Sequence, residues 1–324
     1  MAFSLVFHGS NAAVFADGFK TLTESKHTIH ILPDILESAE QKTIYIQADV
    51  IVGIAYNTQL PRPDGLKLYH VPGAGYDGVD QTALPTKAHL CNCFGHEQPI
   101  AEYVMAALLN RVIPMRKADQ DLREGRWTYW AGGSGSTHGE IAGLRVGLLG
   151  FGHIGKAIAK RAKAFDMEVV VANRSAVPVS DLVDNAYTLN DMDGFWQNSD
   201  AVICSLPLTP ETKGLVGHAA FAKMKKTAVI INVGRGPVID ETALYETLKE
   251  HKIAGAIIDT WYQYPSAEKS ETLPAQQPFH TLENIVMTPH MSGWTEGTIR
   301  RRRETIAENI NRLARGAALI NQIR

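Results

Sequence analysis

The sequence predicts an α/β fold of two domains, each built on a parallel sheet, and three observations carry this prediction. Short β-branched runs alternate with polar or helical stretches through the first hundred residues, as expected when strands and helices take turns along the chain. A second series of the same kind begins in mid-chain, at residues 144–149. The chain has 324 residues and is 45% apolar, so it is long enough to bury two cores.

The first series supplies four strand candidates and one long helix. The strand candidates are the runs at residues 5–7, 29–32, 50–54 and 66–71. From Glu97 onward, apolar side chains between Ile100 and Leu108 recur at helical spacing. This spacing predicts a long helix with one apolar stripe, which we expect to connect the two domains.

The second series follows a Gly/Ser-rich stretch at residues 131–136, which is typical of a loop. It opens with an apolar run at residues 144–149 that predicts a buried strand. Further strands are expected to end near Asn173, Ser205, Asn232 and Asp259, with one more at residues 285–287. The helical spacing of Ile299, Ile306, Ile310 and Leu313 then predicts a C-terminal helix.

The composition excludes several classes of function. The formal net charge is -2, so no overall field draws the chain onto nucleic acid or an anionic membrane. No stretch approaches the roughly 18 uninterrupted apolar residues that span a bilayer, and the N-terminus lacks a signal-peptide pattern. The three cysteines have no metal-ligand spacing and are typical of a reducing compartment. We therefore expect a soluble cytoplasmic protein whose partner is a small molecule, with no metal.

A G-x-G-x-x-G pattern at residues 150–155 predicts a dinucleotide-binding turn. The pattern is specific here because it directly follows the apolar run 144–149 and precedes the helical run 156–165. Because of this context, we interpret the chain as a nicotinamide-dependent oxidoreductase. The alternative interpretation is a tight turn that binds no ligand.

The residues of this turn have distinct expected tasks. Gly150 permits the tight turn, Gly152 lets the backbone approach the pyrophosphate, and Gly155 lets the helix pack on the strand. His153 and Ile154 open the helix, whose N-terminus faces the phosphates.

The end of the next strand bears on the choice of cofactor. NAD-selective sites carry an acid about 20 residues beyond the glycines, where it accepts hydrogen bonds from the ribose 2′-hydroxyl. This chain has Asn173, Arg174 and Ser175 instead, 18 positions beyond Gly155. A neutral amide removes the repulsion toward a 2′-phosphate, and a guanidinium and a hydroxyl can donate to one. The sequence therefore predicts a preference for NADP(H) over NAD(H); the alternative is that Arg174 is only a solvated surface residue or stacks on adenine.

Further segments complete a pattern that resembles the D-isomer-specific 2-hydroxyacid dehydrogenases. In chain order they are Gly73-Ala74-Gly75-Tyr76-Asp77, the loop S-L-P-L-T-P-E-T at residues 205–212, Asn232-Val233-Gly234-Arg235-Gly236, Asp259 at the end of G-A-I-I-D, and Thr288-Pro289-His290. The resemblance covers nearly the whole chain. It implies reversible reduction of a 2-keto acid to a D-2-hydroxy acid, with glyoxylate or hydroxypyruvate as model substrates.

The resemblance also implies the architecture. A Rossmann-type doubly wound parallel sheet, at residues 99–292, is expected to be inserted into a flavodoxin-like α/β substrate domain. That substrate domain would hold residues 1–98 and 293–324, with the active site in the cleft between the domains. A homodimer is expected by family analogy.

The chemistry of keto-acid reduction explains two of the matching residues. A cation must hold the substrate carboxylate and polarise the carbonyl, and the forked guanidinium of Arg235 suits that role. The resemblance makes His290 the general acid in reduction and the base in oxidation, which suits an imidazole because its reference pKa is ~6.5. It places the amides of Ala74 and Gly75 at the substrate carboxylate.

The resemblance assigns the remaining contacts to the cofactor. Asp259 is expected at the nicotinamide, although an aspartate after a strand equally caps a turn. The other expected cofactor-binding residues are Leu206, Pro207, Thr212 and Val233.

One position departs from the family pattern. The family continues from the Asp259 position as D-x-F-x-x-E-P, and its glutamate pairs with the catalytic histidine. Here the run is D-T-W-Y-Q-Y-P, which puts Tyr264 at the place of that glutamate. A phenol still hydrogen-bonds an imidazole but supplies no negative charge. Tyr264 is therefore the expected histidine partner, unless Glu97, Glu268 or Glu271 replaces the missing acid.

Two alternative functions follow from this departure. Formate dehydrogenases of the same superfamily carry glutamine at the glutamate position, and their T-P-H-x-S-G run resembles residues 288–293. In this chain Gln263 lies one residue too early. The other alternative is a dinucleotide-sensing binding protein with little turnover, against which the presence of both Arg235 and His290 argues.

The run of four arginines at residues 300–303 is not interpreted as a nucleic-acid site. Consecutive positions point around a helix rather than along one face. A solvated helix start is expected.

Overall fold

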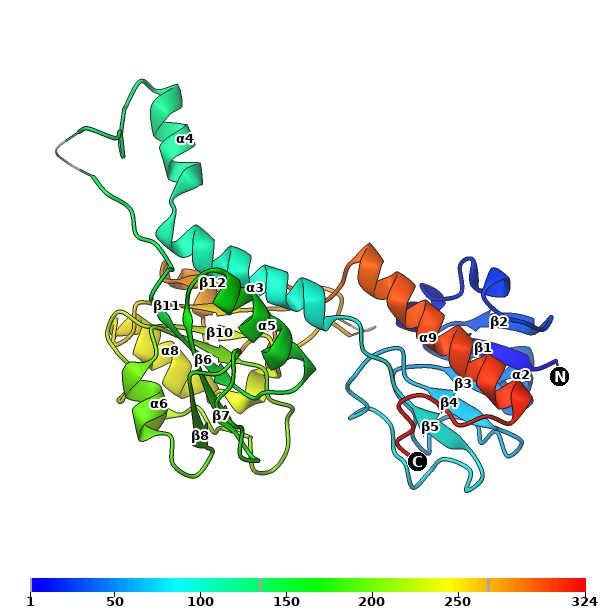
Figure 1. Ribbon diagram of the computed structural model, residues 1–324. Coiled ribbons are helices and arrows are strands. Elements are labelled where there is room, and N and C mark those ends of the chain that lie inside the picture. The colour runs from blue at the N-terminus through cyan, green and yellow to red at the C-terminus, as the bar shows by residue number, and fades with distance from the viewer. Residues whose placement is uncertain (1, 134–135, 267–268) are drawn as a thin grey trace. The chain divides into compact units, whose positions relative to one another are not determined.

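The computed structural model describes residues 2–133, 136–266 and 269–324, and the chain forms two compact units. Unit 1 comprises Met1–Gly95 and Trp294–Arg324, and unit 2 comprises His96–Gly293 (Figure 1). Unit 2 is thus an insertion in the chain of unit 1. The expected α/β fold class is confirmed, because both units are built on parallel sheets.

Unit 1 contains a five-stranded sheet in which all neighbours are parallel. Its strands are β1 (Ser4–His8), β2 (Thr28–Leu32), β3 (Val50–Val52), β4 (Leu68–His70) and β5 (His89–Cys91). The order β2-β1-β3-β4-β5 is that of flavodoxin-like sheets.

The helices of unit 1 cover its sheet. They are α1 (Ser10–Ala13), η1 (Phe19–Thr21), α2 (Ala39–Ile46) and α9 (Glu296–Arg315). Helix α9, which ends at the left-handed Gly316, buries Ile306 and Ile310 in one core cluster with Phe7 of β1 and Val50 of β3. The C-terminal helix therefore packs on the sheet formed by the first ninety-one residues.

The arginine run at the start of α9 is partly buried, which corrects the expectation of a solvated helix start. Arg301 Nε donates to the carbonyl oxygen of Gly95 at 2.9 Å. Arg303 donates to the carbonyl oxygen of Val14 at 3.2 Å. Consecutive arginines do point around the helix, but their directions lead to different loops of the same unit.

Unit 2 contains a seven-stranded parallel sheet. Its strands are β6 (Arg145–Leu149), β7 (Glu168–Asn173), β8 (Asn185–Thr188), β9 (Ala201–Cys204), β10 (Val229–Asn232), β11 (Gly255–Ile258) and β12 (Ile285–Met287). The order β12-β11-β10-β9-β6-β7-β8 reverses direction at β6, as in doubly wound dinucleotide-binding folds.

Helices cover both faces of the unit 2 sheet. They are α3 (Glu97–Val112), α5 (His153–Ala164), α6 (Asp193–Asn198), α7 (His218–Phe221) and α8 (Glu241–Lys249), with single turns η2 (Gly236–Val238) and η3 (Phe279–Thr281). Helix α4 (Met115–Arg123) projects away from the sheet (Figure 1). Adjacent residues of one strand belong to different core clusters: Ile231 of β10 packs with α3 and α5, and Ile230 packs with α6 and α8. This two-sided burial explains the continuous apolar strands.

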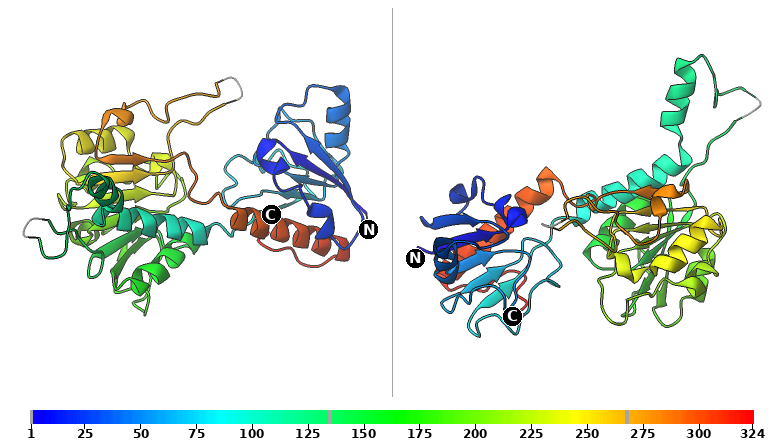
Figure 2. Two further views of the ribbon diagram at one scale, coloured as in Figure 1. Left: turned by 90° about the horizontal axis from the view of Figure 1, so that it is seen from above. Right: turned by 180° about the vertical axis from the view of Figure 1, so that it is seen from behind.

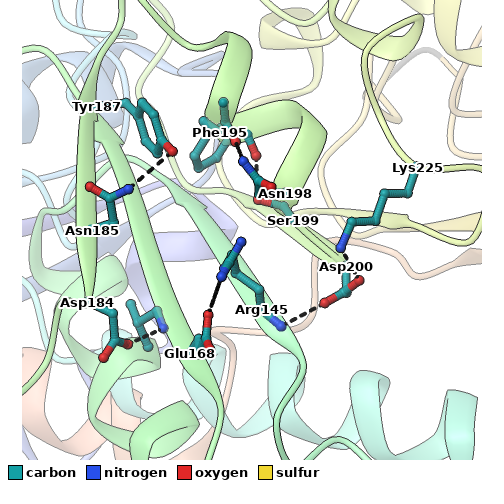
Figure 3. Close-up of polar contacts among 12 residues, drawn as sticks. Arg145, Glu168, Asp184, Asn185, Tyr187, Phe195, Asn198, Ser199, Asp200 and Lys225 are labelled. Atoms are coloured by element: carbon teal, nitrogen blue, oxygen red, sulfur yellow. Dashed lines mark hydrogen bonds and ion pairs between the residues drawn. The ribbon is translucent and has the colours of Figure 1, made fainter.

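The amino-terminal edge of the unit 2 sheet is held by charged side chains (Figure 3). Asp200, just before β9, accepts from the backbone N–H of Arg145 at 2.8 Å and from Lys225 Nζ at 2.6 Å. Arg145, the first residue of β6, also pairs with Glu168 at the start of β7. Ion pairs therefore fasten neighbouring strands at this edge.

Within the described ranges, no helix is both long and apolar enough to cross a membrane.

Candidate active site

The residues expected to bind the cofactor and catalyse the reaction in unit 2 gather at one edge of its sheet. In a parallel sheet all carboxyl ends lie on the same edge, and each predicted segment follows such an end. The segments are 150–155 after β6, 173–175 at the end of β7, 205–212 after β9, 233–235 after β10, 259–264 after β11 and 290 after β12.

The glycine turn has a geometry that only glycine permits at two positions. Gly150 has a φ of 101°, a left-handed conformation. A Cβ on Gly155 would lie 2.3 Å from the carbonyl oxygen of Gly150, so the first turn of α5 packs directly on the preceding loop. At Gly152, the N-cap of α5, an added Cβ would meet no described atom within 4 Å. The backbone there is open to a ligand, and His153 and Ile154 begin the helix.

Asn173 joins the glycine turn to the end of β7. Its side-chain oxygen accepts from the N–H of Phe151 at 3.3 Å, and its amide donates to the carbonyl oxygen of Ser175 at 3.0 Å. Arg174 and Ser175 are exposed beside it. A hydrogen bond with Thr209 and the charge of Arg174 lower the pKa of Glu211. Arg174 therefore lies within electrostatic range of the loop that follows β9.

The loop after β9 is closed on itself by Thr212. The hydroxyl of Thr212 donates to the carbonyl oxygen of Pro207 at 2.7 Å and accepts from the N–H of Thr209 at 2.8 Å. Leu206 is buried, and its backbone lies against Gly234 of the next loop. Neighbouring loops at this edge thus fix each other's course.

Arg235 lies between two glycines whose role is packing. A Cβ on Gly234 would lie 2.6 Å from the carbonyl oxygen of Leu206, and one on Gly236 would lie 2.3 Å from that of Trp261. The buried Asn232 side chain accepts from the Gly234 N–H and donates to the carbonyl oxygen of Arg235. The guanidinium itself donates to the Gly234 carbonyl oxygen at 2.9 Å. The close approach of neighbouring backbone therefore explains why both residues beside Arg235 are glycines.

Asp259 organises the loop that carries His290. Its fully buried carboxylate accepts from the Thr288 hydroxyl at 2.6 Å and the Met291 N–H at 2.9 Å through Oδ1. Through Oδ2 it accepts from the Ser292 N–H at 3.0 Å and the Ser292 hydroxyl at 2.5 Å. Each oxygen has two lone pairs, so these four bonds use the acceptor capacity of the carboxylate. Its contact with the nicotinamide stays a prediction.

His290 has a left-handed backbone, with a φ of 56°. Such a conformation is uncommon for a residue with a side chain and persists when its surroundings impose it. The bonds from Asp259 fix Thr288 on one side of His290 and Met291 on the other. The loop therefore presents an exposed imidazole from a fixed backbone.

Tyr264 contacts the ring of His290. Its hydroxyl oxygen lies 3.0 Å from His290 Nδ1, and it accepts a hydrogen bond from the Trp261 N–H at 3.1 Å. Partial burial raises the pKa of Tyr264 from its ordinary value, whereas the Trp261 hydrogen bond and the charge of Arg235 lower it. The Tyr264 phenol thus lies beside His290, in the place that the comparison with the family motif predicted for the partner of the histidine.

The three acids considered as replacements have different positions. Glu97 is the first residue of α3, and Glu271 is exposed. Glu268 lies outside the described residues.

Ala74 and Gly75 belong to unit 1, in the loop that follows β4. The carbonyl oxygen of Ala74 accepts from the Asn92 side chain at 2.7 Å, and that of Gly73 accepts from the Cys93 N–H at 3.1 Å. The loop is therefore tied to the chain that leaves β5.

Sequence reasoning missed the residues that act through others. Trp261 donates from its backbone to Tyr264 and from Nε1 to the Thr288 carbonyl oxygen at 2.7 Å. Tyr103 of α3 lies 2.7 Å from the Thr288 hydroxyl. Their positions depend on strands that are distant in the chain, and no local motif announces them. Among the described residues no cluster of three or more metal-ligating side chains occurs.

Comparison with known proteins identifies the class to which this site belongs. The family model for the D-isomer specific 2-hydroxyacid dehydrogenase, NAD binding domain, matches residues 105–292. This span contains the carboxyl-edge segments described above. The chain belongs to the D-isomer specific 2-hydroxyacid dehydrogenase family, a family of NAD(P)-dependent oxidoreductases. The resemblance deduced from the motifs is confirmed.

Two relatives in sequence and one solved structure show how far the similarity extends. A glyoxylate reductase of Korarchaeum cryptofilum is 32% identical over 76% of this chain and 74% of its own length. A hydroxypyruvate reductase of Thermotoga maritima is 31% identical over 86% of this chain and 89% of its own length. A D-isomer specific 2-hydroxyacid dehydrogenase of Xanthobacter autotrophicus, solved with NADPH and MES, has a TM-score of 0.77 at 26% identity and covers 100% of this chain and 98% of its own.

Proposed function

We propose that the chain is an NADPH-dependent reductase of small 2-keto acids such as glyoxylate or hydroxypyruvate. The observation that carries the proposal is the presence of Arg235 and His290 on loops at the same sheet edge as the glycine turn 150–155. The relatives named glyoxylate and hydroxypyruvate reductase support the substrate class.

The proposed roles follow from the chemistry of each side chain. Arg235 binds the substrate carboxylate and polarises the carbonyl, and His290 delivers a proton to the oxygen that develops negative charge. When bound, the dihydronicotinamide supplies the hydride. In unit 1, which we propose as the substrate domain, the amides of Ala74 and Gly75 hold the carboxylate.

The glycine turn and the loops beside it are proposed to hold the dinucleotide. The open backbone at Gly152 and the start of the twelve-residue helix α5 suit a pyrophosphate. The loop of Leu206, Pro207 and Thr212, together with Val233 and Asp259, lines the same edge.

A substrate screen tests this function. Purified protein is assayed with NADPH and with NADH against glyoxylate, hydroxypyruvate, pyruvate and bulkier 2-keto acids, and with formate and NADP⁺ or NAD⁺ in the opposite direction. We expect the small 2-keto acids to be reduced. Binding of a dinucleotide without turnover of any keto acid would contradict the proposal and favour a sensing role.

The preference for NADP(H) is the finer part of the proposal. Asn173 carries a neutral amide where NAD-selective sites have a carboxylate for the ribose 2′-hydroxyl. Two loop hydrogen bonds hold this amide in place. The exposed guanidinium of Arg174 is adjacent. The NADPH found with the Xanthobacter relative is in line with this choice.

Exchange of Arg174 tests the preference. A hydrogen bond between charged groups contributes about 1.5–3 kcal/mol, so Arg174→Ala is expected to raise the KM for NADPH roughly tenfold or more. The KM for NADH should stay within about twofold. Arg145→Ala, at the opposite edge of the same sheet, is the control and should leave both values unchanged. A wild-type preference for NADH would overturn the assignment.

We also propose a homodimer that uses α4 and the segment after it. Helix α4 and the residues that follow it as far as 133 stand apart from the unit 2 sheet (Figures 1 and 2), and Trp127 is 67% and Trp130 58% exposed. This segment is nevertheless ordered by its own contacts, because Lys117 and Arg126 bind Asp121 and lower its pKa to about 2. A preformed surface with exposed aromatic side chains suits a protein interface.

Sedimentation velocity tests the assembly. The double variant Trp127→Ser/Trp130→Ser is expected to sediment as a monomer, whereas Ile35→Ser, which changes an exposed residue of unit 1, should not. A monomeric wild-type protein would contradict the proposal.

The three cysteines are free and buried, which supports the expected reducing, cytoplasmic compartment.

A further inference from the structure

The contact between Tyr264 and His290 bears on which nitrogen of the imidazole carries a proton. A phenol has one hydroxyl proton to donate and two lone pairs to accept with. The Trp261 N–H at 3.1 Å occupies one lone pair of the Tyr264 oxygen. The hydroxyl proton then needs an acceptor, and His290 Nδ1 lies at 3.0 Å.

We propose that Tyr264 donates its hydroxyl proton to Nδ1 of His290 and thereby holds the neutral imidazole in its Nε2–H form. The catalytic consequence rests on the proposed reductase function. The hydrogen bond itself is a property of unit 2, because all three residues lie in the segment from 261 to 290.

The surroundings favour this direction of the bond. Partial burial raises the pKa of Tyr264, so the hydroxyl keeps its proton at neutral pH and has it available to donate. The backbone on each side of His290 is fixed by Asp259 through Thr288 and Met291. The ring is therefore anchored by its backbone and oriented by the phenol.

A glutamate at position 264 would have the opposite effect. A carboxylate only accepts hydrogen bonds, so it requires a proton on Nδ1 and leaves the Nε2 lone pair open in the neutral ring. A phenol can also accept from imidazolium through its second lone pair, but for the neutral ring it is the donor. The exchange of glutamate for tyrosine therefore changes which nitrogen carries the proton, in addition to removing a negative charge.

This arrangement provides a two-proton path for keto-acid reduction. A bound dihydronicotinamide would supply the hydride for the new C–H bond, and the carbonyl π electrons would move to oxygen. That oxygen takes the Nε2 proton as the electrons of the broken N–H bond remain on the ring. Nδ1 then takes the Tyr264 proton, which leaves a phenolate stabilised by the Trp261 N–H and the charge of Arg235. Tyr264 is 49% exposed and recovers a proton from water.

Nitrogen NMR tests the tautomer without any turnover. The protein is labelled with ¹⁵N-histidine and examined at a pH well above the reference pKa of imidazole, and His290→Gln identifies the signal. We expect Nδ1 to resonate as an unprotonated nitrogen and Nε2 as a protonated one. In Tyr264→Glu the two assignments should exchange. A wild-type ring with its proton on Nδ1 would overturn the proposal.

Kinetics test the proton path. Tyr264→Phe is expected to lower kcat for keto-acid reduction roughly tenfold, a part of the total for general acid catalysis, with little change in KM. The solvent isotope effect of the wild type should require two protons in a proton inventory, and that of Tyr264→Phe only one. Tyr262→Phe is the matched control, because the Tyr262 hydroxyl lies 3.1 Å from the Ile239 carbonyl oxygen and serves another loop.

The outcomes separate this proposal from the proposed function. If no keto acid is reduced but Nε2 carries the proton, the reductase function fails and the hydrogen bond stands. If keto acids are reduced and Tyr264→Phe keeps full kcat and the wild-type tautomer, the role of Tyr264 is contradicted while the reductase function stands.

Discussion

The two edges of the unit 2 sheet use polar side chains in different ways. At the amino-terminal edge, the Asp200 carboxylate accepts from the Arg145 backbone N–H and from Lys225, and the Arg145 guanidinium pairs with Glu168 (Figure 3). At the carboxyl edge, Arg235 and His290 stand on loops that are held mainly by backbone contacts and by the buried Asp259. The first edge joins strands, and the second presents side chains.

This difference separates structural from functional polar residues. An ion pair between the first residues of two neighbouring strands contributes to the free energy of unfolding, by at most about 1 kcal/mol where the pair is exposed to solvent. The left-handed backbone conformation of His290 costs conformational energy. The exposed imidazole does not offset this cost by packing in a core, which is typical of a functional residue. Substitutions at the carboxyl edge should therefore reduce turnover, and substitutions at the amino edge should reduce stability.

The largest effect is expected at His290. His290→Gln removes the proposed proton donor, so kcat for keto-acid reduction should fall on the order of 10²–10⁴-fold. The melting temperature should change little because the side chain is exposed. His280→Gln changes another exposed histidine, on η3, and should keep wild-type kcat. Equal activity of both variants would refute the catalytic assignment.

A substitution of Asp259 should lower both kcat and stability, because its carboxylate is buried and holds the loop that carries His290. In Asp259→Asn one side-chain oxygen becomes an amide that cannot accept from the N–H groups of the 288–292 loop. A buried donor left without a partner costs about 1–3 kcal/mol, measurable by urea unfolding. Displacement of His290 should lower kcat on the order of tenfold to a hundredfold. A variant that loses stability but keeps full kcat would show that the loop does not depend on Asp259.

At the amino edge, Asp200→Ala should lower stability without changing the reaction. The substitution removes acceptors of the Arg145 N–H and of Lys225, which corresponds to about 1–2 kcal/mol of unfolding free energy. The kcat and both KM values should remain within about twofold of wild type. A large loss of kcat in a folded variant would break the distinction between the two edges.

The smallest effect concerns pH at the same amino edge. Burial opposes the ionisation of Asp184, but hydrogen bonds from the Val169 N–H and from Lys163 hold its pKa below the usual value. A carboxyl with a lowered pKa in the folded state stabilises the protein above its unfolded pKa and loses this contribution as pH falls through the folded pKa. Unfolding free energies should therefore decline less steeply on acidification in Asp184→Asn than in wild type. Asp181→Asn, at an exposed neighbouring position, should retain the wild-type slope.

Much of the fold could be predicted because its signals are local. Apolar runs bounded by turn residues announced β1, β6 and β7, and the glycine spacing placed the turn at Gly150 before α5. One strand escaped prediction, β8. It carries Asn185 and Thr188 at its ends, so it lacks the apolar run that the prediction required.

The candidate site was predictable where a motif is continuous and obscure where it is assembled. Arg235 and His290 stand in short runs that can be recognised in the chain. The roles of Trp261 and Asn232 could not be recognised, although Asn232 stands in the same run as Arg235, because these roles are defined only by the loops that fold against them. The same holds for the arginines of α9, whose burial depends on loops hundreds of residues away in sequence.

The sequence by itself determined the α/β class, the dinucleotide turn and the replacement of a glutamate by Tyr264, because each depends on residue types at fixed spacing along the chain. Only the tertiary structure decided what these residues do for one another. The direction of a hydrogen bond depends on three-dimensional neighbours, and the Trp261 N–H beside the Tyr264 oxygen is the contact from which we infer that the phenolic proton is donated to His290. The saturation of Asp259 by one loop is likewise a matter of distances between strands that the chain order does not contain.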